Sequence, residues 1–184
     1  MSDTAAVRHL ADRDWDAVVA LEHDAYAGLG LSEGRAALQS RAAASPGTCF
    51  VLDVGGRTAG YLLALPYPEF RCPELGRVEP AARTGGNLHL HDIVVAPALR
   101  RRGLGRLLLG RLTGTARARG DRRISLVAVG GSDRFWSARG FTAHPGVAPA
   151  DGYGPDAVYM SRPVPAARPG PAGPPAPTSL REVS

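Results

Sequence analysis

One segment, residues 88–120, constrains the fold more than any other part of the chain. It begins with an apolar run rich in branched residues, Leu88 to Val95, which is typical of a buried strand. Pro97 follows this run, and a turn rich in arginine and glycine comes next. Leucines then recur at helical spacing, and Gly120 is suited to a left-handed helix C-cap. The sequence therefore predicts a strand, a basic turn and a helix that begins near residues 103–105.

The basic turn has the composition of an anion-binding site. Glycines at a helix start let backbone N–H groups approach a phosphate, and the positive end of the helix dipole favours an anion there. Arginines beside them add charge-assisted hydrogen bonds. A solvated surface turn is the alternative, but the strand before it and the helix after it favour a phosphate cradle. The predicted cradle consists of Arg100, Arg101, Arg102, Gly103, Leu104, Gly105 and Arg106.

At these residues the chain resembles the GNAT superfamily of acyl-CoA-dependent N-acyltransferases. The pyrophosphate signature of that family is Arg or Gln, two residues, Gly, one residue, then Gly or Ala, and Arg100–Gly105 meets every fixed position. A second family motif, a helix with an aromatic pair followed by Gly-Phe, is present at Phe135–Phe141. The resemblance covers Val7–Ser161. It implies an α/β fold whose mixed, mostly antiparallel sheet is splayed at the acyl-CoA site and flanked by helices, with acetyl-CoA as co-substrate.

Two histidines in the strand are candidates for moving protons. Period-2 alternation places His89 and His91 on one face, and Leu90 and Asp92 on the other. The His-x-His pattern is similar to the arylalkylamine N-acetyltransferase branch, whose histidines are taken to remove the amine's proton, directly or through water. A neutral imidazole with a pKa of about 6.5 suits this role. A packing role, or a zinc site without obvious further ligands, is the alternative, and no metal is expected.

The resemblance also suggests where the rest of the cofactor lies. Pantetheine is expected along Ile93, Val94 and Val95, and a backbone N–H at Val94 or Val95 is expected to stabilise the oxyanion. Trp136 stands where many family members have the tyrosine that protonates the leaving thiolate, and an indole is no useful acid. Trp136 is expected to pack against the cofactor or the core. Tyr153, between two glycines, is the candidate phenol, with water or an ordinary turn tyrosine as alternatives.

The other elements follow from local signals. Asp12 or Asp14 is predicted to cap a helix through Tyr26, and Ser32 a second helix through Ala44. Gly55-Gly56 predicts a hairpin between strands at 49–54 and 58–65. Further elements are predicted at 124–129, 132–139, 141–143 and 157–161. Residues 66–86 form a long loop that either covers the acceptor or stands aside, and its glutamates are expected to be surface residues.

Composition bounds the remaining possibilities. Residues 1–162 are predicted to form one domain, and residues 163–184, with seven prolines, a disordered tail. The net charge of +5 comes from arginine alone, because the chain has no lysine, and no basic helix indicates nucleic-acid binding. No signal peptide or membrane-length apolar run is apparent. Two unclustered cysteines predict a cytoplasmic protein, and the oligomeric state is left open, with a homodimer as one option.

The predicted function is transfer of acetyl from acetyl-CoA to a small primary amine by direct attack. A non-catalytic CoA-binding module, suggested by Trp136 at the acid position, is one alternative. A protein acetyltransferase acting on a lysine or an N-terminus is another. Such an enzyme would need an open acceptor groove rather than a closed pocket. The acceptor itself does not follow from the sequence.

Overall fold

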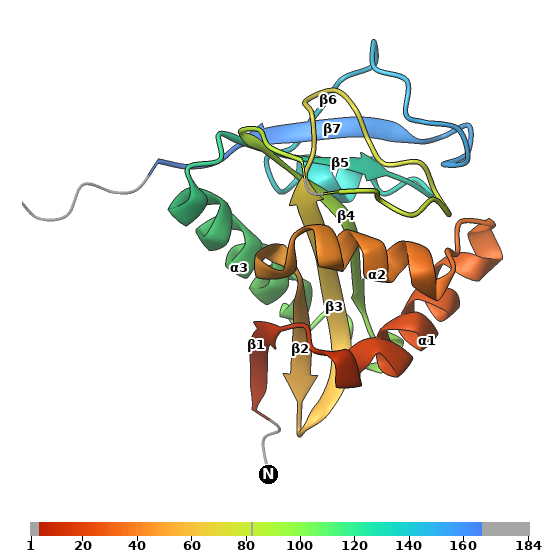
Figure 1. Cartoon of the computed structure of the whole chain (residues 1–184), viewed down its shortest axis with the longest axis vertical. Helices are drawn as coiled ribbons and strands as arrows, with labels where there is room; N and C mark the ends of the chain where they lie inside the picture. The colour runs from red at the N-terminus through yellow and green to blue at the C-terminus, as the bar shows by residue number, and fades with distance from the viewer. Residues whose placement is uncertain (1–3, 82, 167–184) are drawn as a thin grey trace, which may run out of the picture.

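The computed structural model describes residues 4–81 and 83–166, which form a seven-stranded sheet of order β1-β2-β3-β4-β5-β7-β6 (Figure 1). All neighbouring strands are antiparallel except β4 and β5, which are parallel. This arrangement confirms the predicted α/β class and the mostly antiparallel sheet. The strands are β1 (Ala5–His9), β2 (Phe50–Val54), β3 (Arg57–Pro66), β4 (Asn87–Val95), β5 (Arg123–Ala128), β6 (Thr142–Ala143) and β7 (Val158–Pro163).

Helices cover both faces of the sheet. On one face α1 (Trp15–Tyr26) and α2 (Arg35–Ala44) supply Trp15, Val18 and Leu38 to a core with β2, β3 and β4. On the other face α3 (Leu104–Arg119) and the short α4 (Asp133–Ser137) pack through Leu108, Leu112 and Trp136. Figure 1 shows α3 on the opposite side of the sheet from α2. Single 3₁₀ turns lie at Asp12–Asp14, Ala27–Leu29, Pro46–Thr48 and Pro97–Leu99.

The sheet is splayed between β4 and β5. These strands pair only from Asn87 to His89, against Arg123 to Ser125, and no pairing follows beyond that point. Both strands continue along their outer partners, β4 to Val95 beside β3 and β5 to Ala128 beside β7. Unpaired backbone groups of two diverging strands therefore face one another across an opening, as the predicted splay requires.

A β-bulge in β4 changes which side chains share a face. Leu63 pairs with Asp92 and the next β3 residue, Ala64, pairs with Leu90, so His91 is the extra residue. Leu90 packs in the α3-side core, whereas Asp92 bonds with Tyr61 of the other core. The expectation that Asp92 lies opposite the histidines is therefore wrong. Strict alternation fails here because a bulge inserts one extra residue and so shifts the two-residue alternation of side chains between the faces of the sheet.

Other local predictions are confirmed with shifts at their ends, except for the helix N-caps: Asp14 precedes α1 without a side-chain cap hydrogen bond. The hairpin turns at Gly55-Gly56, and α3 ends at Gly120, whose φ of 78° is left-handed. Ser32 does not cap α2 but donates to Glu22, and the edge strand β1 was not predicted. Val164 packs on the α3-side core. Residues 167–184 of the predicted tail lie outside the described residues. No helix in the described part of the chain is long and apolar enough to span a membrane.

Candidate active site

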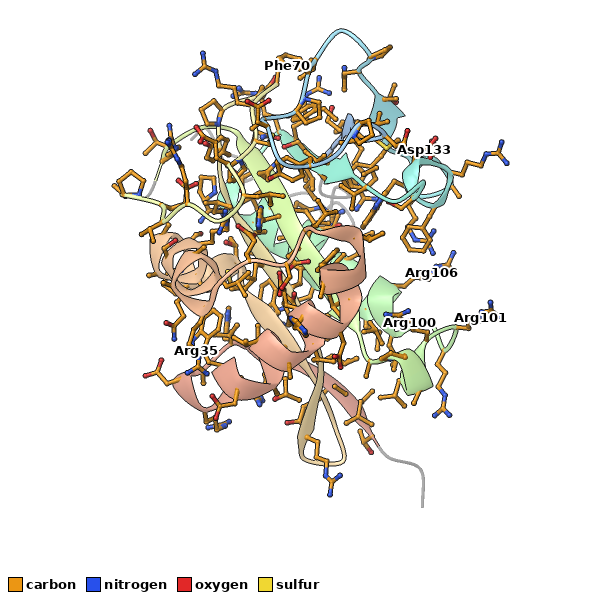
Figure 2. All side chains as sticks on the ribbon, turned by 90° about the vertical axis from the view of Figure 1, so that its right-hand side faces the viewer. Arg35, Phe70, Arg100, Arg101, Arg106 and Asp133 are labelled. Carbon is orange, nitrogen blue, oxygen red and sulfur yellow. The ribbon has the colours of Figure 1, made fainter. Side chains whose placement is uncertain are left out.

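A cavity of about 750 Å³ fills the opening between β4 and β5. Ile93 and Val95 line it from β4, and Leu126 and Val127 from β5. Its outer end reaches the first turn of α3, where Figure 2 shows Arg100, Arg101 and Arg106 grouped together. The wall is thus apolar along the strands and basic at the helix start. A ligand with an apolar arm and an anionic end matches this distribution.

The basic end is built by an unusual backbone conformation. Arg101 and Gly103 have φ values of 64° and 77°, both in the left-handed region, directly before α3 begins. Such turns aim successive N–H groups into one concavity, and the helix dipole adds partial positive charge there. A Cβ built on Gly103 meets nothing within 4 Å, so the space beside the turn is open to a ligand. Arg100 Nε donates to the Val95 carbonyl at 3.1 Å, which ties the turn to β4.

The predicted cradle and pantetheine residues divide into two groups. Those that line the cavity are Ile93, Val95, Arg100, Arg101, Gly103, Leu104, Gly105, Arg106 and Trp136. Arg102 and Val94 do not line it. Val94 packs in the core with α1 and α2, and its carbonyl lies against Gly60 of β3, 2.7 Å from where a Cβ would stand. Because backbone groups alternate along a strand, Val95 rather than Val94 faces the opening.

A second, smaller cavity of about 50 Å³ adjoins the first. It lies between α1, the α1–α2 link, β4 and two loops, and its lining residues are Glu22, Tyr26, Leu31, Glu33, Leu75, His91, Asp92, Val127, Val129 and Tyr153. Tyr26, His91 and Asp92 line both cavities, as do Val127 and Val129. The two cavities therefore meet at the bulge of β4.

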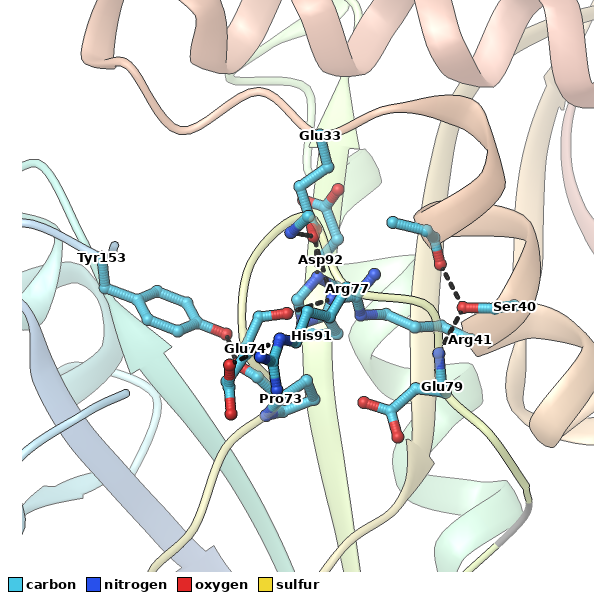
Figure 3. A network of polar contacts seen from close by, with 12 residues as sticks. Glu33, Ser40, Arg41, Pro73, Glu74, Arg77, Glu79, His91, Asp92 and Tyr153 are labelled. Carbon is cyan, nitrogen blue, oxygen red and sulfur yellow. Dashed lines mark hydrogen bonds and ion pairs between the residues drawn. The ribbon is translucent and has the colours of Figure 1, made fainter. Parts of the chain in front are cut away.

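His91 belongs to a buried chain of polar contacts (Figure 3). Its Nε2 lies 2.6 Å from Glu33 Oε1, and Glu33 Oε2 lies 2.9 Å from Nη2 of the fully buried Arg41. Burial alone would raise the pKa of Glu33, but the bond with His91 and the charge of Arg41 bring it below its usual value. An ionised Glu33 can only accept, so His91 Nε2 carries the hydrogen and Nδ1 is a free acceptor.

Burial lowers the pKa of His91, and the contact with Glu33 offsets only part of that effect. The imidazole is therefore neutral near pH 7 and able to accept a proton at Nδ1. This nitrogen is buried and has no hydrogen-bond partner among the described residues. Glu33 holds the ring orientation and stabilises the imidazolium that would form. The arrangement is that of a general base with an anionic partner.

Asp92 stands beside His91 in a different environment. Tyr61 donates its hydroxyl to Oδ2, and Tyr26 also bonds with the carboxylate. Burial raises the pKa of Asp92 to about 7, opposed by these two hydrogen bonds and assisted by the negative charges of Glu22 and Glu33. Its Oδ1 is buried without a partner in the described part of the chain. Asp92 can thus change charge near neutral pH while facing both cavities.

The family model for the acetyltransferase (GNAT) family matches residues 15–141, which include the bulged strand, the basic turn and α4. The chain belongs to the GNAT family. No curated protein sequence matches it. The GNAT assignment fits a splayed sheet whose opening ends at a helix N-terminus, since this fold binds CoA or acyl-CoA.

Solved structures share this fold at low identity. Ard1 from Thermoplasma volcanium is 19% identical with a TM-score of 0.66, over 87% of this chain and 97% of that one. The ribosomal-protein-S18-alanine N-acetyltransferase from Escherichia coli is 20% identical with a TM-score of 0.62, over 90% and 97%. A GNAT-like decarboxylase, GphF, in complex with isobutyryl-CoA is 23% identical with a TM-score of 0.69, over 87% and 100%. At such identities the likeness establishes the fold alone.

His89, the first histidine of the pair on β4, does not reach the site. His89 is 1% exposed, its Nδ1 lies 3.0 Å from Ser125 Oγ, and its ring stacks on Tyr159 with Tyr67 nearby. It lines neither cavity. Burial lowers the pKa of His89 well below its usual value, and the charges of a protonated His91 and of Arg41 add to the effect. These contacts are those of a packing residue, which was the alternative weighed for the pair.

The two aromatic candidates are also placed. Trp136 lines the larger cavity and packs edge-on against Phe135 and Phe141, as expected of a residue at the boundary of cofactor and core. Tyr153 lines only the smaller cavity, and its hydroxyl donates to the Pro73 carbonyl at 2.7 Å. Burial raises the pKa of Tyr153, so the phenol stays protonated. Tyr26, which sequence reasoning missed, is the phenol that faces both cavities.

The loop at residues 66–86 lies against α2 and the smaller cavity. Gly76 donates its N–H to Glu33, Arg41 donates to the Glu74 carbonyl at 2.9 Å, and Glu79 N–H donates to Ser40 Oγ at 2.8 Å. Leu75, between the first two contacts, lines the cavity. The loop therefore forms part of the site wall instead of standing aside. Within the described residues, no group of three or more His, Cys, Asp or Glu side chains could hold a metal ion.

Proposed function

We propose that this GNAT protein transfers an acetyl group from acetyl-CoA to the nitrogen of a small primary amine. The observation that carries the proposal is the His91–Glu33 pair at the meeting point of two cavities, one shaped for an acyl-CoA and one for a small acceptor. Such a junction is where the acyl carbon and the attacking nitrogen must meet.

The residues of the larger cavity fit acetyl-CoA. Arg100, Arg101 and Arg106 offer charge-assisted hydrogen bonds to the pyrophosphate, together with the N–H groups at residues 103–105. The apolar wall from Ile93, Val95, Leu104 and Trp136 suits the pantetheine arm. Val95 is the proposed donor of a backbone N–H, because Val94 faces β3.

His91 is the proposed general base. An alkyl ammonium ion, with a pKa near ~10, is unreactive until a proton leaves. Nδ1 of His91 accepts that proton, and the Nε2–H bond to Glu33 stabilises the resulting imidazolium. The free amine then attacks the thioester carbonyl without a covalent enzyme intermediate. His89, which lines neither cavity, has no part in this proton transfer.

The leaving thiolate has a pKa near ~8.5 and departs readily. Tyr26 is the proposed proton donor, because its phenol lines both cavities and burial keeps its pKa well above 10. Tyr153, the phenol expected from the sequence, lines the acceptor cavity only. Tyr26→Phe is expected to lower kcat by about 10-fold or more, and Tyr153→Phe to act mainly through amine KM.

The wall at residues 72–76 supports a small acceptor over a protein chain. Three segments crowd the smaller cavity through Leu31, Leu75 and Tyr153, and hydrogen bonds from Arg41 and Tyr153 fix the loop. A peptide N-terminus or lysine would have to pass these side chains. Cys49 and Cys72 are both free thiols, which supports the reducing, cytoplasmic compartment that we propose.

Thiol release from acetyl-CoA tests the function directly. The panel holds short alkylamines, arylalkylamines, polyamines, aminoglycosides and short peptides, and acetyl-CoA binding is measured in parallel by calorimetry. Turnover with a small amine is the expected result. Tight acetyl-CoA binding without thiol release for any amine of the panel would instead favour the non-catalytic CoA-binding module. Turnover restricted to peptides would favour the protein acetyltransferase.

A further inference from the structure

Two buried hydrogen-bond acceptors lie beside the junction of the cavities. They are Nδ1 of His91 and Oδ1 of Asp92, both without a partner among the described residues. Both side chains line both cavities, and the bulge in β4 places the two residues side by side on one face. Buried acceptors are normally paired, so this pair indicates a ligand with at least two donors. A primary ammonium group has three.

The charge around the smaller cavity favours a cation. Glu22, Glu33 and Asp92 line it, and none of its lining residues in the described chain is an arginine. Arg41 lies behind Glu33, held by the Glu33 carboxylate and the Glu74 carbonyl. Burial and the neighbouring carboxylates hold the pKa of Asp92 at about 7, and a bound cation would reverse that penalty. A ligand carboxylate would instead face three acidic side chains and no free cation.

Volume limits the length of the ligand. The smaller cavity measures about 50 Å³, and one water-sized group occupies roughly 10–15 Å³ of such volume, so roughly four non-hydrogen atoms fit. Its far wall is apolar through Leu31 and Leu75. Leu75 itself is held against Gly152, whose built Cβ would lie 3.7 Å from Leu75 Cβ. This wall suits an alkyl chain and has no room for an aromatic ring.

From these observations we infer that the acceptor is a short, unbranched primary alkylamine without a carboxylate, whose nitrogen binds Asp92 Oδ1 and His91 Nδ1. The inference rests on the proposed acyl transfer. Asp92 accepts one N–H of the ammonium ion and His91 accepts a second, so the third N–H points away from the carboxylate. His91 Nδ1 then takes one proton, the free amine forms the C–N bond, the C–S bond breaks, and Tyr26 protonates the departing thiolate of CoA. The nitrogen loses its second proton as the amide forms, this proton returns to the Tyr26 oxygen, and the proton on His91 passes to solvent.

The test is a rate comparison at saturating acetyl-CoA. We expect kcat/KM to be highest for ethylamine to butylamine and at least about 10-fold lower for 2-phenylethylamine. Glycinamide and glycine, each with as many non-hydrogen atoms as butylamine, form a matched pair that differs in charge, and the amide is expected to be the better acceptor by about 10-fold or more. Turnover confined to arylalkylamines, to carboxylated amines or to peptides would overturn this inference while leaving acyl transfer intact.

Two variants separate the roles. In Asp92→Asn the amide oxygen keeps accepting from Tyr61 and Tyr26, so the amide N–H₂ group faces the amine. The KM for the amine should therefore rise about 10-fold or more, and the KM for acetyl-CoA should change by less than about twofold. Leu75→Ala, on the loop, should make hexylamine the longest well-accepted amine, and a failure to do so would contradict the assigned wall.

Binding of propylamine to the CoA-loaded enzyme, measured by calorimetry, is the readout without turnover. Binding with no turnover would support the pocket and overturn the acyl transfer; no binding would overturn the pocket.

Discussion

Glu33→Gln removes one charge from a buried ion pair and keeps the shape of the side chain. Glu33 is the only carboxylate within 4.0 Å of Arg41 in the described chain, and Arg41 is fully buried with Nε and Nη1 unpaired. Leaving one partner of such a pair uncompensated costs about 3–5 kcal/mol. For a domain of this size each kcal/mol lowers Tm by about 2–4 °C, so the expected fall is about 6–20 °C.

Thermal and urea unfolding of four proteins measure this cost: wild type, Glu33→Gln, Arg41→Met and the double variant. The double variant removes both charges of the pair, so it should recover at least half of the stability lost by Glu33→Gln. Because the pKa of Glu33 is lowered on folding, its contribution is present above its unfolded pKa and lost as pH falls through the folded value. A Glu33→Gln loss below about 1 kcal/mol, or a double variant no more stable than the single, would refute the ion-pair argument.

Three further predictions concern the cofactor turn and Asp92. Gly103→Ala places a side chain on a residue with φ 77°, so it should lower the free energy of unfolding by about 1–2 kcal/mol and raise the KM for acetyl-CoA. Its control, Gly110→Ala, lies inside α3 with open space around it and should be neutral or stabilising in the same unfolding and kinetic assays. Arg106→Ala should raise acetyl-CoA KM by about 10-fold, and Arg102→Ala, outside the cavity, by less than about twofold. Because the pKa of Asp92 is about 7, kcat/KM for the amine should rise through pH 7 as the carboxylate ionises, and Asp92→Asn should lose that step; an unchanged profile would exclude Asp92 from amine binding.

Local sequence signals were sufficient to predict the strand, turn and helix at residues 87–119. Leucine periodicity and Gly120 set α3, and Gly55-Gly56 set the hairpin, because each signal lies within a few residues of the element that it specifies. The strand β1 gave no such signal. Its residues, Ala5–His9, form a half-exposed edge strand with neither a strong apolar alternation nor a turn signal of its own.

The acceptor site could not be predicted in the same way. The bulge at His91 depends on the register of β4 against β3, and register is a property of two strands that no single window contains. Glu33 lies in the link before α2 and Arg41 lies within α2, and Glu33 meets His91 only in the folded chain. The sequence identified His89 and His91 as a pair, but it could not show that Ser125 and Tyr159 enclose the first while Glu33 orients the second.

The role of His91 is tested most directly by comparing His91→Gln with His89→Gln in thiol release from acetyl-CoA, using the best amine of the panel and samples shown to be folded. His91→Gln is expected to lower kcat by about 10²-fold with acetyl-CoA KM nearly unchanged, because His91, unlike His89, lies at the junction of the cavities. His89→Gln should lose stability and keep kcat within about threefold of the wild type. Equal losses of kcat in the two folded variants, or full activity of His91→Gln, would contradict the assignment of His91 as the base.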